Sequence, residues 1–102
     1  MSTSGLTDDE VLRDVRLLVG RPSVAWSRHA EQRMAERGIS KVEVKRCLQL
    51  GHFDERPTLS NRPGPIEYSF RMVFRVDGET IAVAGSLVPS TRVVVITAFH
   101  LT

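Results

Sequence analysis

A stretch in the first half of the chain holds the residues best suited to chemistry. His29, Arg33 and Arg37 recur at every fourth position, so a helix places them on one ridge. The ridge borders the apolar positions Ala30 and Met34, which would face the core. An imidazole at the rim of a packing interface can take a pKa suited to proton transfer, and neighbouring guanidinium groups can bind an anion. The structural alternative is that these side chains cover the core or form ion pairs with nearby acids.

A second set of polar residues lies on a predicted strand. Residues 66–76 alternate, with apolar side chains at the even positions and Ser69, Arg71 and Arg75 on the opposite face. Arginines on one face of a strand can follow a phosphate backbone, so these residues are candidates for nucleic-acid binding. The alternative is the ordinary solvent-exposed side of an antiparallel sheet.

The last predicted strand, residues 92–100, ends in two further candidates. Thr97 and His100 point to opposite faces by alternation, so only one can share a face with His29 unless the strand is bulged. We favour His100 as the second proton-transfer group, against the alternative of an exposed histidine near the terminus. His52, in a loop or short strand, is a weaker candidate. Because the last strand is apolar on both faces, we expect it to be central and covered on both sides.

The charges are unevenly distributed along the chain. Fourteen basic residues exceed twelve acidic ones, which gives a net charge of +2, and twelve of the basic residues are arginine. Arginine binds phosphate through two parallel hydrogen bonds, although a codon bias would also raise the arginine count. Residues 8–14 carry four acids, whereas residues 21–46 carry seven basic residues against three acidic ones. This local excess predicts a basic patch and a polyanionic partner.

Local signals define the elements that must position these residues. Capping boxes at Thr7 and Ser40, and a serine cap at Ser27, predict three helices. Those helices cover about residues 8–20, 28–37 and 41–50. The strands are predicted at about 52–56, 66–76, 79–88 and 92–100. Helices followed by an antiparallel meander indicate the α+β class.

Length and composition exclude several kinds of protein. A chain of 102 residues forms one domain, which we place at residues 7–102 after a flexible N-terminus at residues 1–6. No apolar run approaches the ~20 residues that span a bilayer, and the start lacks the pattern of a signal peptide. The single cysteine, Cys47, is expected in the core, and three scattered histidines give no metal-binding spacing. We therefore expect a cytoplasmic protein without a metal, a cofactor or a membrane partner.

Two motifs together resemble a known family. The helix after Ser27 reads His-x3-Arg-Met-x2-Arg-Gly-Ile over residues 29–39, and the last strand reads Val-Val-Val-Ile-Thr-Ala-Phe-His over residues 93–100. This pattern, over about residues 24–100, resembles a family of small prokaryotic domains of unknown function. That family is usually grouped beside the RelE/ParE, BrnT and MqsR toxins. The resemblance implies a RelE/ParE toxin-like fold, with helices packed on a three- to four-stranded antiparallel sheet.

The resemblance also implies an activity. Relatives in this class include metal-independent endoribonucleases of the mRNA interferase type, which belong to toxin–antitoxin or mobile-element systems. His29, Arg33 and Arg37 match the family's helical polar positions, Thr97 matches the end of its last strand, and His100 stands where tyrosine is commoner. A base would take the 2′-hydroxyl proton of RNA, the arginines would stabilise the phosphorane, and an acid would protonate the leaving oxygen. The implied partners are RNA or the ribosome, and an antitoxin protein.

A binding module without catalysis is the alternative function on the same fold. Such a module would bind nucleic acid through Ser69, Arg71, Arg75 and Thr97, or a protein through an edge of the sheet. The acidic first helix suits contact with a protein better than contact with RNA. Because one fold hosts many functions, the fold alone does not decide between these possibilities.

Overall fold

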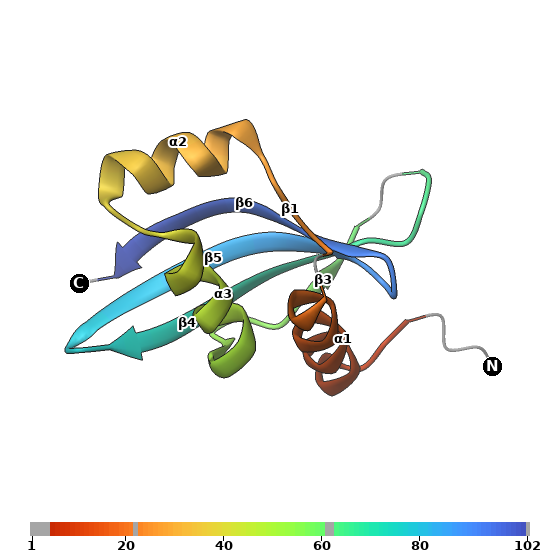
Figure 1. Cartoon of the computed structure of the whole chain (residues 1–102). Helices are drawn as coiled ribbons and strands as arrows, with labels where there is room; N and C mark the ends of the chain where they lie inside the picture. Colours follow the sequence, from red (N-terminus) through yellow and green to blue (C-terminus); the bar gives the residue numbers. More distant parts are fainter. Residues whose placement is uncertain (1–4, 22, 61–62, 102) are drawn as a thin grey trace.

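The chain folds into three helices and a six-stranded sheet over the residues that the computed structural model describes, 5–21, 23–60 and 63–101 (Figure 1). The helices are α1 (Asp8–Gly20), α2 (Arg28–Arg37) and α3 (Lys41–Leu50). The strands are β1 (Val24–Trp26), β2 (His52–Phe53), β3 (Thr58–Leu59), β4 (Tyr68–Val76), β5 (Glu79–Val88) and β6 (Arg92–Leu101). The predicted α+β class is confirmed. No described helix is long and apolar enough to cross a membrane.

Each helix begins at the cap that its sequence predicts. The Thr7 hydroxyl accepts the amide of Glu10 at 3.1 Å, and the Glu10 carboxylate accepts the amide of Thr7 at 2.8 Å. Ser40 and Glu43 form the same reciprocal pair at the start of α3. Ser27 caps α2 by accepting a hydrogen bond from a backbone amide. Such caps contribute about 1 kcal/mol each, because they satisfy amides that have no partner within the helix.

The sheet is mixed and has more strands than predicted. The strands are ordered β1-β6-β5-β4-β2. β3 pairs with β4 on the same edge as β2 but at a different part of that strand. β1 runs parallel to β6, whereas the other pairs are antiparallel. The predicted antiparallel sheet of three or four strands is therefore corrected to a six-stranded mixed sheet. The added strands are two or three residues long, which is too short for alternation to reveal them.

All three helices pack on one face of the sheet. Their buried side chains form a single core with the strand residues that face them, such as Met72, Val83 and Val95. In Figure 1, α2 lies along β6, while α1 and α3 lie in front of the sheet. No described helix covers the opposite face. The expectation that β6 is covered on both sides is therefore wrong: Val94 is only half-buried and Ile96 is 44% exposed.

We call this uncovered surface the helix-free face. The strand register aligns its side chains in rows across β4, β5 and β6. It carries Ser69, Arg71, Val73 and Arg75 of β4, Thr80, Ala82, Ala84 and Ser86 of β5, and Val94, Thr97, Phe99 and Leu101 of β6. One solvent-exposed face is ordinary for a largely antiparallel sheet, and it leaves these side chains accessible to a ligand or partner.

A β-bulge interrupts β6 and sets the orientation of its last residues. Ala84 pairs with Thr97 but the next residue, Gly85, pairs with Val95, so Ile96 is the extra residue. Gly85 has no room for a side chain, since a Cβ would lie 2.8 Å from the Phe70 ring. Bulges increase the local twist of a strand. This bulge precedes Thr97 and His100, so the two side chains still point to opposite faces.

The N-terminal segment meets the sheet just before α1. The amide of Leu6 donates a 2.6 Å hydrogen bond to the hydroxyl of Tyr68, a buried residue of β4. The predicted flexible N-terminus at residues 1–6 thus includes one residue that is tied to the fold. Residues 1–4 of that segment, and the last residue of the predicted domain, lie outside the described residues.

Candidate nucleic-acid interface

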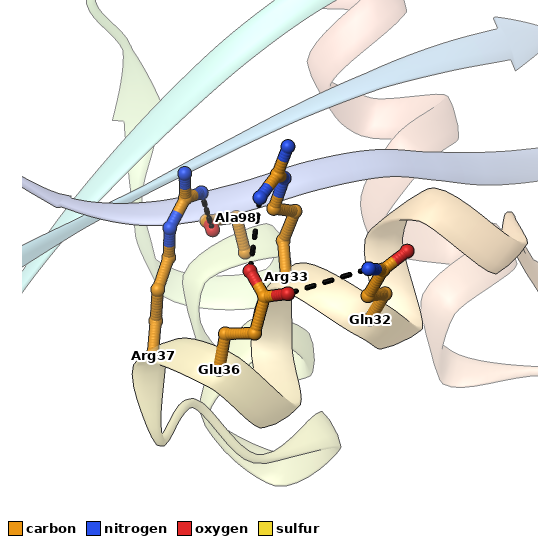
Figure 2. Close-up of polar contacts among 5 residues, drawn as sticks. All are labelled: Gln32, Arg33, Glu36, Arg37 and Ala98. Atoms are coloured by element: carbon orange, nitrogen blue, oxygen red, sulfur yellow. Dashed lines mark hydrogen bonds and ion pairs between the residues drawn. The ribbon is translucent and has the colours of Figure 1, made fainter.

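The ridge of His29, Arg33 and Arg37 winds gradually around α2. Four residues turn a helix by about 400°, which is about 40° more than a full turn. Over eight residues the direction therefore changes by about 80°, and the positions separate by about 12 Å along the axis. His29 is exposed, Arg33 is half-buried, and only Arg37 reaches β6. Arg33 and Arg37 extend side by side, with the Glu36 carboxylate near both (Figure 2), whereas His29 lies further back along the helix.

Arg37 occupies the edge of β6 that β1 leaves unpaired. β1 ends at Trp26, which pairs with Val95, and the Ser27 hydroxyl then donates to the carbonyl of Ile96 at 3.2 Å. Two residues further along β6, Arg37 Nη1 donates to the carbonyl of Ala98 at 2.8 Å (Figure 2). The side chains of Arg37 and of Ser27, the N-cap of α2, thus satisfy edge carbonyls that a longer β1 would have paired.

Arg33 is engaged with an acid on its own helix. Its Nη1 lies 2.9 Å from Glu36 Oε1, and the other carboxylate oxygen accepts a 3.3 Å hydrogen bond from Gln32 (Figure 2). The hydrogen bond from Arg33 is the largest cause that lowers the pKa of Glu36 below its ordinary value. This pair matches the structural alternative for the ridge, in which the arginines bridge to acids.

His100 holds the end of α2 against the sheet. Its Nε2 lies 3.1 Å from the carbonyl oxygen of Arg37, which can only accept, so Nε2 carries a proton there. Its Nδ1 lies 3.4 Å from Glu79 Oε1 at the start of β5. His100 pairs with Ile81 and faces the helix side of the sheet, opposite to Thr97. The structure therefore brings His100 to Arg37 but not to His29, which lies about two helical turns away.

The four residues predicted to bind nucleic acid share the helix-free face. Arg71 and Thr97 both pair with Ala84 of β5, so they stand in one row across three strands. Ser69 lies opposite Ser86 on the same face, and Arg75 lies opposite Thr80. Because β5 contributes only small side chains between them, long side chains from β4 and β6 can approach one another above it.

Arg71 is fixed above this face by an acid and an aromatic ring. Its Nε donates to Asp54 Oδ2 at 2.7 Å, and its guanidinium carbon lies 5.6 Å from the centre of the Phe99 ring. The hydrogen bond with Asp54 raises the pKa of Arg71, so the guanidinium stays charged. Phe99 was not among the residues predicted from the sequence. Alternation places Phe99 on the same side as Thr97, but only the register across β5 shows that this is also the side of Arg71.

A histidine also joins the helix-free face. His52 pairs directly with Val73, so its exposed side chain stands between the positions of Arg71 and Arg75. The sequence made it a weak candidate, placed in a loop or a short strand. The next residue, Phe53, faces the core and packs with Phe70 at a ring separation of 6.0 Å. This anchor is what fixes the orientation of His52.

A shallow pocket opens beside Arg71 at the edge of the helix-free face. It has a volume of about 190 Å³ and is lined by Glu55, Arg56, Thr58, Ser69, Phe70, Arg71 and Ala84. In the described part of the chain, no group of three histidine, cysteine, aspartate or glutamate residues could hold a metal ion. This face presents arginine, histidine, an aromatic ring and hydroxyl groups, together with the Asp54 carboxylate that pairs with Arg71 and the Glu67 carboxylate that accepts a hydrogen bond from Ser86.

The predicted basic patch lies elsewhere, on α2 and α3. Lys41 forms an ion pair with Glu31 at 3.0 Å and lies 5.0 Å from the centre of the Trp26 ring. Lys45 and Arg46 are exposed and make no ion pair with another described residue. The molecule thus offers two cationic surfaces, the helix-free face and the outer side of α2 and α3.

The match to a known family covers the segment that contains α2, α3 and most of the sheet. The sequence profile of a family described as a domain of unknown function (DUF4258) matches residues 26–100, which is most of the chain. The chain belongs to this family. No curated protein and no solved structure matches the chain. The family resemblance is confirmed, while the link of this DUF4258 domain to the RelE/ParE toxins stays a prediction.

The structure gives most residues of the DUF4258 helix motif a physical role. Met34 is buried, and Arg37 closes the edge of β6. Gly38 ends α2 in the left-handed conformation, with φ of 69°, which a side chain would strain. Ile39 then enters the core, and its amide donates to the Met34 carbonyl at 2.9 Å. This part of the motif therefore docks α2, whereas His29 has no side-chain hydrogen bond with another described residue.

Proposed function

We propose that this DUF4258 domain binds single-stranded RNA across its helix-free face. The observation that carries the proposal is the placement of Arg71 above the Phe99 ring, in the same surface as Arg75, Ser69 and Thr97. A sheet that presents cations and an aromatic ring together can bind phosphates and stack a base. This is the binding function that the sequence left open as the alternative to catalysis.

The spacing of the two arginines supports a single strand over a duplex. Arg71 and Arg75 are four residues apart on β4, about 13 Å along the strand, so they can contact phosphates of one extended strand. Unpaired bases can stack on an aromatic side chain, whereas bases inside a duplex are not accessible to it. Arg75 makes no ion pair with another described residue, and its guanidinium is exposed and free to take a phosphate.

Cleavage by the α2 residues has less geometric support. Arg37 and His100 are used to fasten α2 to β6, and His29 lies about two turns from both. A toxin-like endoribonuclease built on these residues stays a prediction, as do an antitoxin partner and a cytoplasmic location. A small reading frame beside the gene, together with growth arrest on expression, would favour a toxin.

Binding to labelled RNA tests the proposal. Fluorescence anisotropy with a single-stranded oligoribonucleotide should show binding that weakens with salt, and Arg75→Ala should weaken it several-fold and reduce the salt slope by about one phosphate contact. Arg46→Ala removes the same charge from α3 and serves as the matched control, with unchanged affinity. Equal affinities for the wild type and Arg75→Ala, or a loss confined to Arg46→Ala, would refute the proposal.

A further inference from the structure

The position of His52 suggests chemistry on the helix-free face, given the RNA binding proposed above. We propose that this face cleaves RNA and that His52 is its proton-transfer residue. His52 pairs with Val73 at the edge of the sheet, and Arg71 and Arg75 lie two residues to either side of Val73. Diagonal neighbours in a sheet have Cβ atoms about 7–8 Å apart, which long arginine side chains can span.

His52 is the histidine of the described chain that is both on this face and free to act. Its side chain is exposed, and its ring makes no hydrogen bond with another described residue. His100 faces the other side of the sheet and is held by Arg37 and Glu79, while His29 belongs to α2. A general base must be free to reach the proton that it takes, and His52 meets that condition.

The two arginines beside His52 differ in how firmly their side chains are held. Arg71 is held by Asp54 and by Phe99, so its charge stays at one place above the face. Arg75 is exposed and can follow a bound phosphate. Arg75 can therefore stabilise the negative charge that grows on the phosphoryl oxygens, whereas the charge of Arg71 is already balanced by the Asp54 carboxylate.

The reaction needs only RNA and water. His52 takes the proton of a 2′-hydroxyl, and the 2′-oxygen forms a bond to the adjacent phosphorus. The bond from phosphorus to the 5′-oxygen of the next nucleotide breaks, and a water molecule protonates that oxygen. The resulting hydroxide is neutralised by the proton that His52 releases. The products are a 2′,3′-cyclic phosphate and a 5′-hydroxyl end, without oxidation or reduction.

A substrate with one cleavable position tests this inference. We would use a labelled 2′-O-methyl oligonucleotide with a single ribonucleotide, and separate the products by mass. The wild type should cut after that ribonucleotide and leave a cyclic phosphate. His52→Ala and His52→Gln should each lower the cleavage rate by about 100-fold or more while the RNA affinity stays within about a factor of two. Because His52 is exposed, both variants should fold, which circular dichroism checks.

The outcomes separate this inference from RNA binding itself. Wild-type protein that binds the oligonucleotide but never cuts it overturns the role of His52 and leaves the binding function in place. Cleavage that survives both His52 variants, or that is lost instead in His29→Ala, also overturns it. Absence of any RNA binding by the wild type overturns both proposals. Cleavage of an all-2′-O-methyl strand would contradict the attack by the 2′-oxygen.

Discussion

Arg37 Nη1 donates a 2.8 Å hydrogen bond to the carbonyl oxygen of Ala98, three residues beyond the point where β6 loses its partner β1. Together with Ser27 and His100, this contact fastens both ends of α2 to one strand. The helix therefore takes the place of a neighbouring strand along half of β6. Arg37, which the sequence predicts as a catalytic residue, thus has a structural role.

Replacing Arg37 should destabilise the domain and expose a strand edge. Arg37→Met removes a charge-assisted hydrogen bond to a carbonyl that is then left unsatisfied, which should cost about 1–2 kcal/mol of unfolding free energy. Urea denaturation measures this loss. Exposed edges also pair with other chains, so sedimentation should show more self-association than for the wild type.

Arg28 offers the control for this change. It lies at the first position of α2 and makes no ion pair with another described residue. A positive charge at a helix N-terminus is unfavourable, so Arg28→Met should leave the stability unchanged or raise it slightly. A stability loss in Arg28→Met equal to that in Arg37→Met would show that the contact with Ala98 contributes nothing.

The bulge at Gly85 should tolerate no side chain. A Cβ there would lie 2.8 Å from both the Phe70 ring and the Val94 carbonyl, so Gly85→Ala should lower the unfolding free energy by about 1–3 kcal/mol. Gly20, the last residue of α1, has open space around the position that a Cβ would take, and Gly20→Ala should be neutral or stabilising. Thermal unfolding compares the two variants, and equal midpoints would contradict the packing at Gly85.

The helices were predictable because their signals are local. Thr7, Ser27 and Ser40 each cap a helix through an amide three residues further on, so this information lies in the sequence itself. The long strands were predictable for the same reason, since alternation along β4 needs no knowledge of its partners. The short strands β1 and β3 were not, because only their pairing with a longer strand defines them, and β2 is shorter than the strand predicted at residues 52–56.

The structure brings Arg37 and His100 together but leaves His29 apart from them, for geometric reasons. Equal spacing by four residues suggested one ridge, but the helix repeat turns that ridge away from the sheet at His29. Alternation along β4 did place Ser69, Arg71 and Arg75 correctly on one face. The register across β5, however, joins Arg71 to Thr97, which lies far along the chain, and no local pattern could reveal that pairing.

Glu36 should titrate below its ordinary range. The hydrogen bond from Arg33 lowers the pKa of this carboxyl from 4.5. Because the folded-state pKa is the lower one, the resulting stabilisation is present above pH 4.5 and is lost as the pH falls through the folded value. A carbon NMR titration should give a lower midpoint in the wild type than in Arg33→Ala. Identical midpoints would show that the pair does not persist in solution.

Cys47 should be inert in the folded protein. Burial, and to a smaller extent the charge of Asp54, raises the pKa of its thiol from 9.0 to about 12. The folded state therefore keeps a proton that the unfolded state loses, and the unfolding free energy should fall as the pH rises from 9.0 toward 12. A thiol reagent at about pH 8, just below the ordinary thiol pKa, should modify Cys47 only in denaturant. Rapid modification of the folded protein would contradict its burial.

An NMR titration with a short single-stranded RNA distinguishes the two cationic surfaces, because it locates the residues that contact the ligand. If the helix-free face binds RNA, amide signals of β4, β5 and β6 around Arg71, Thr97 and Phe99 should shift as RNA is added. Signals around Lys45 and Arg46 of α3 should then stay in place. Shifts confined to α2 and α3, with the helix-free face unchanged, would contradict RNA binding at that face.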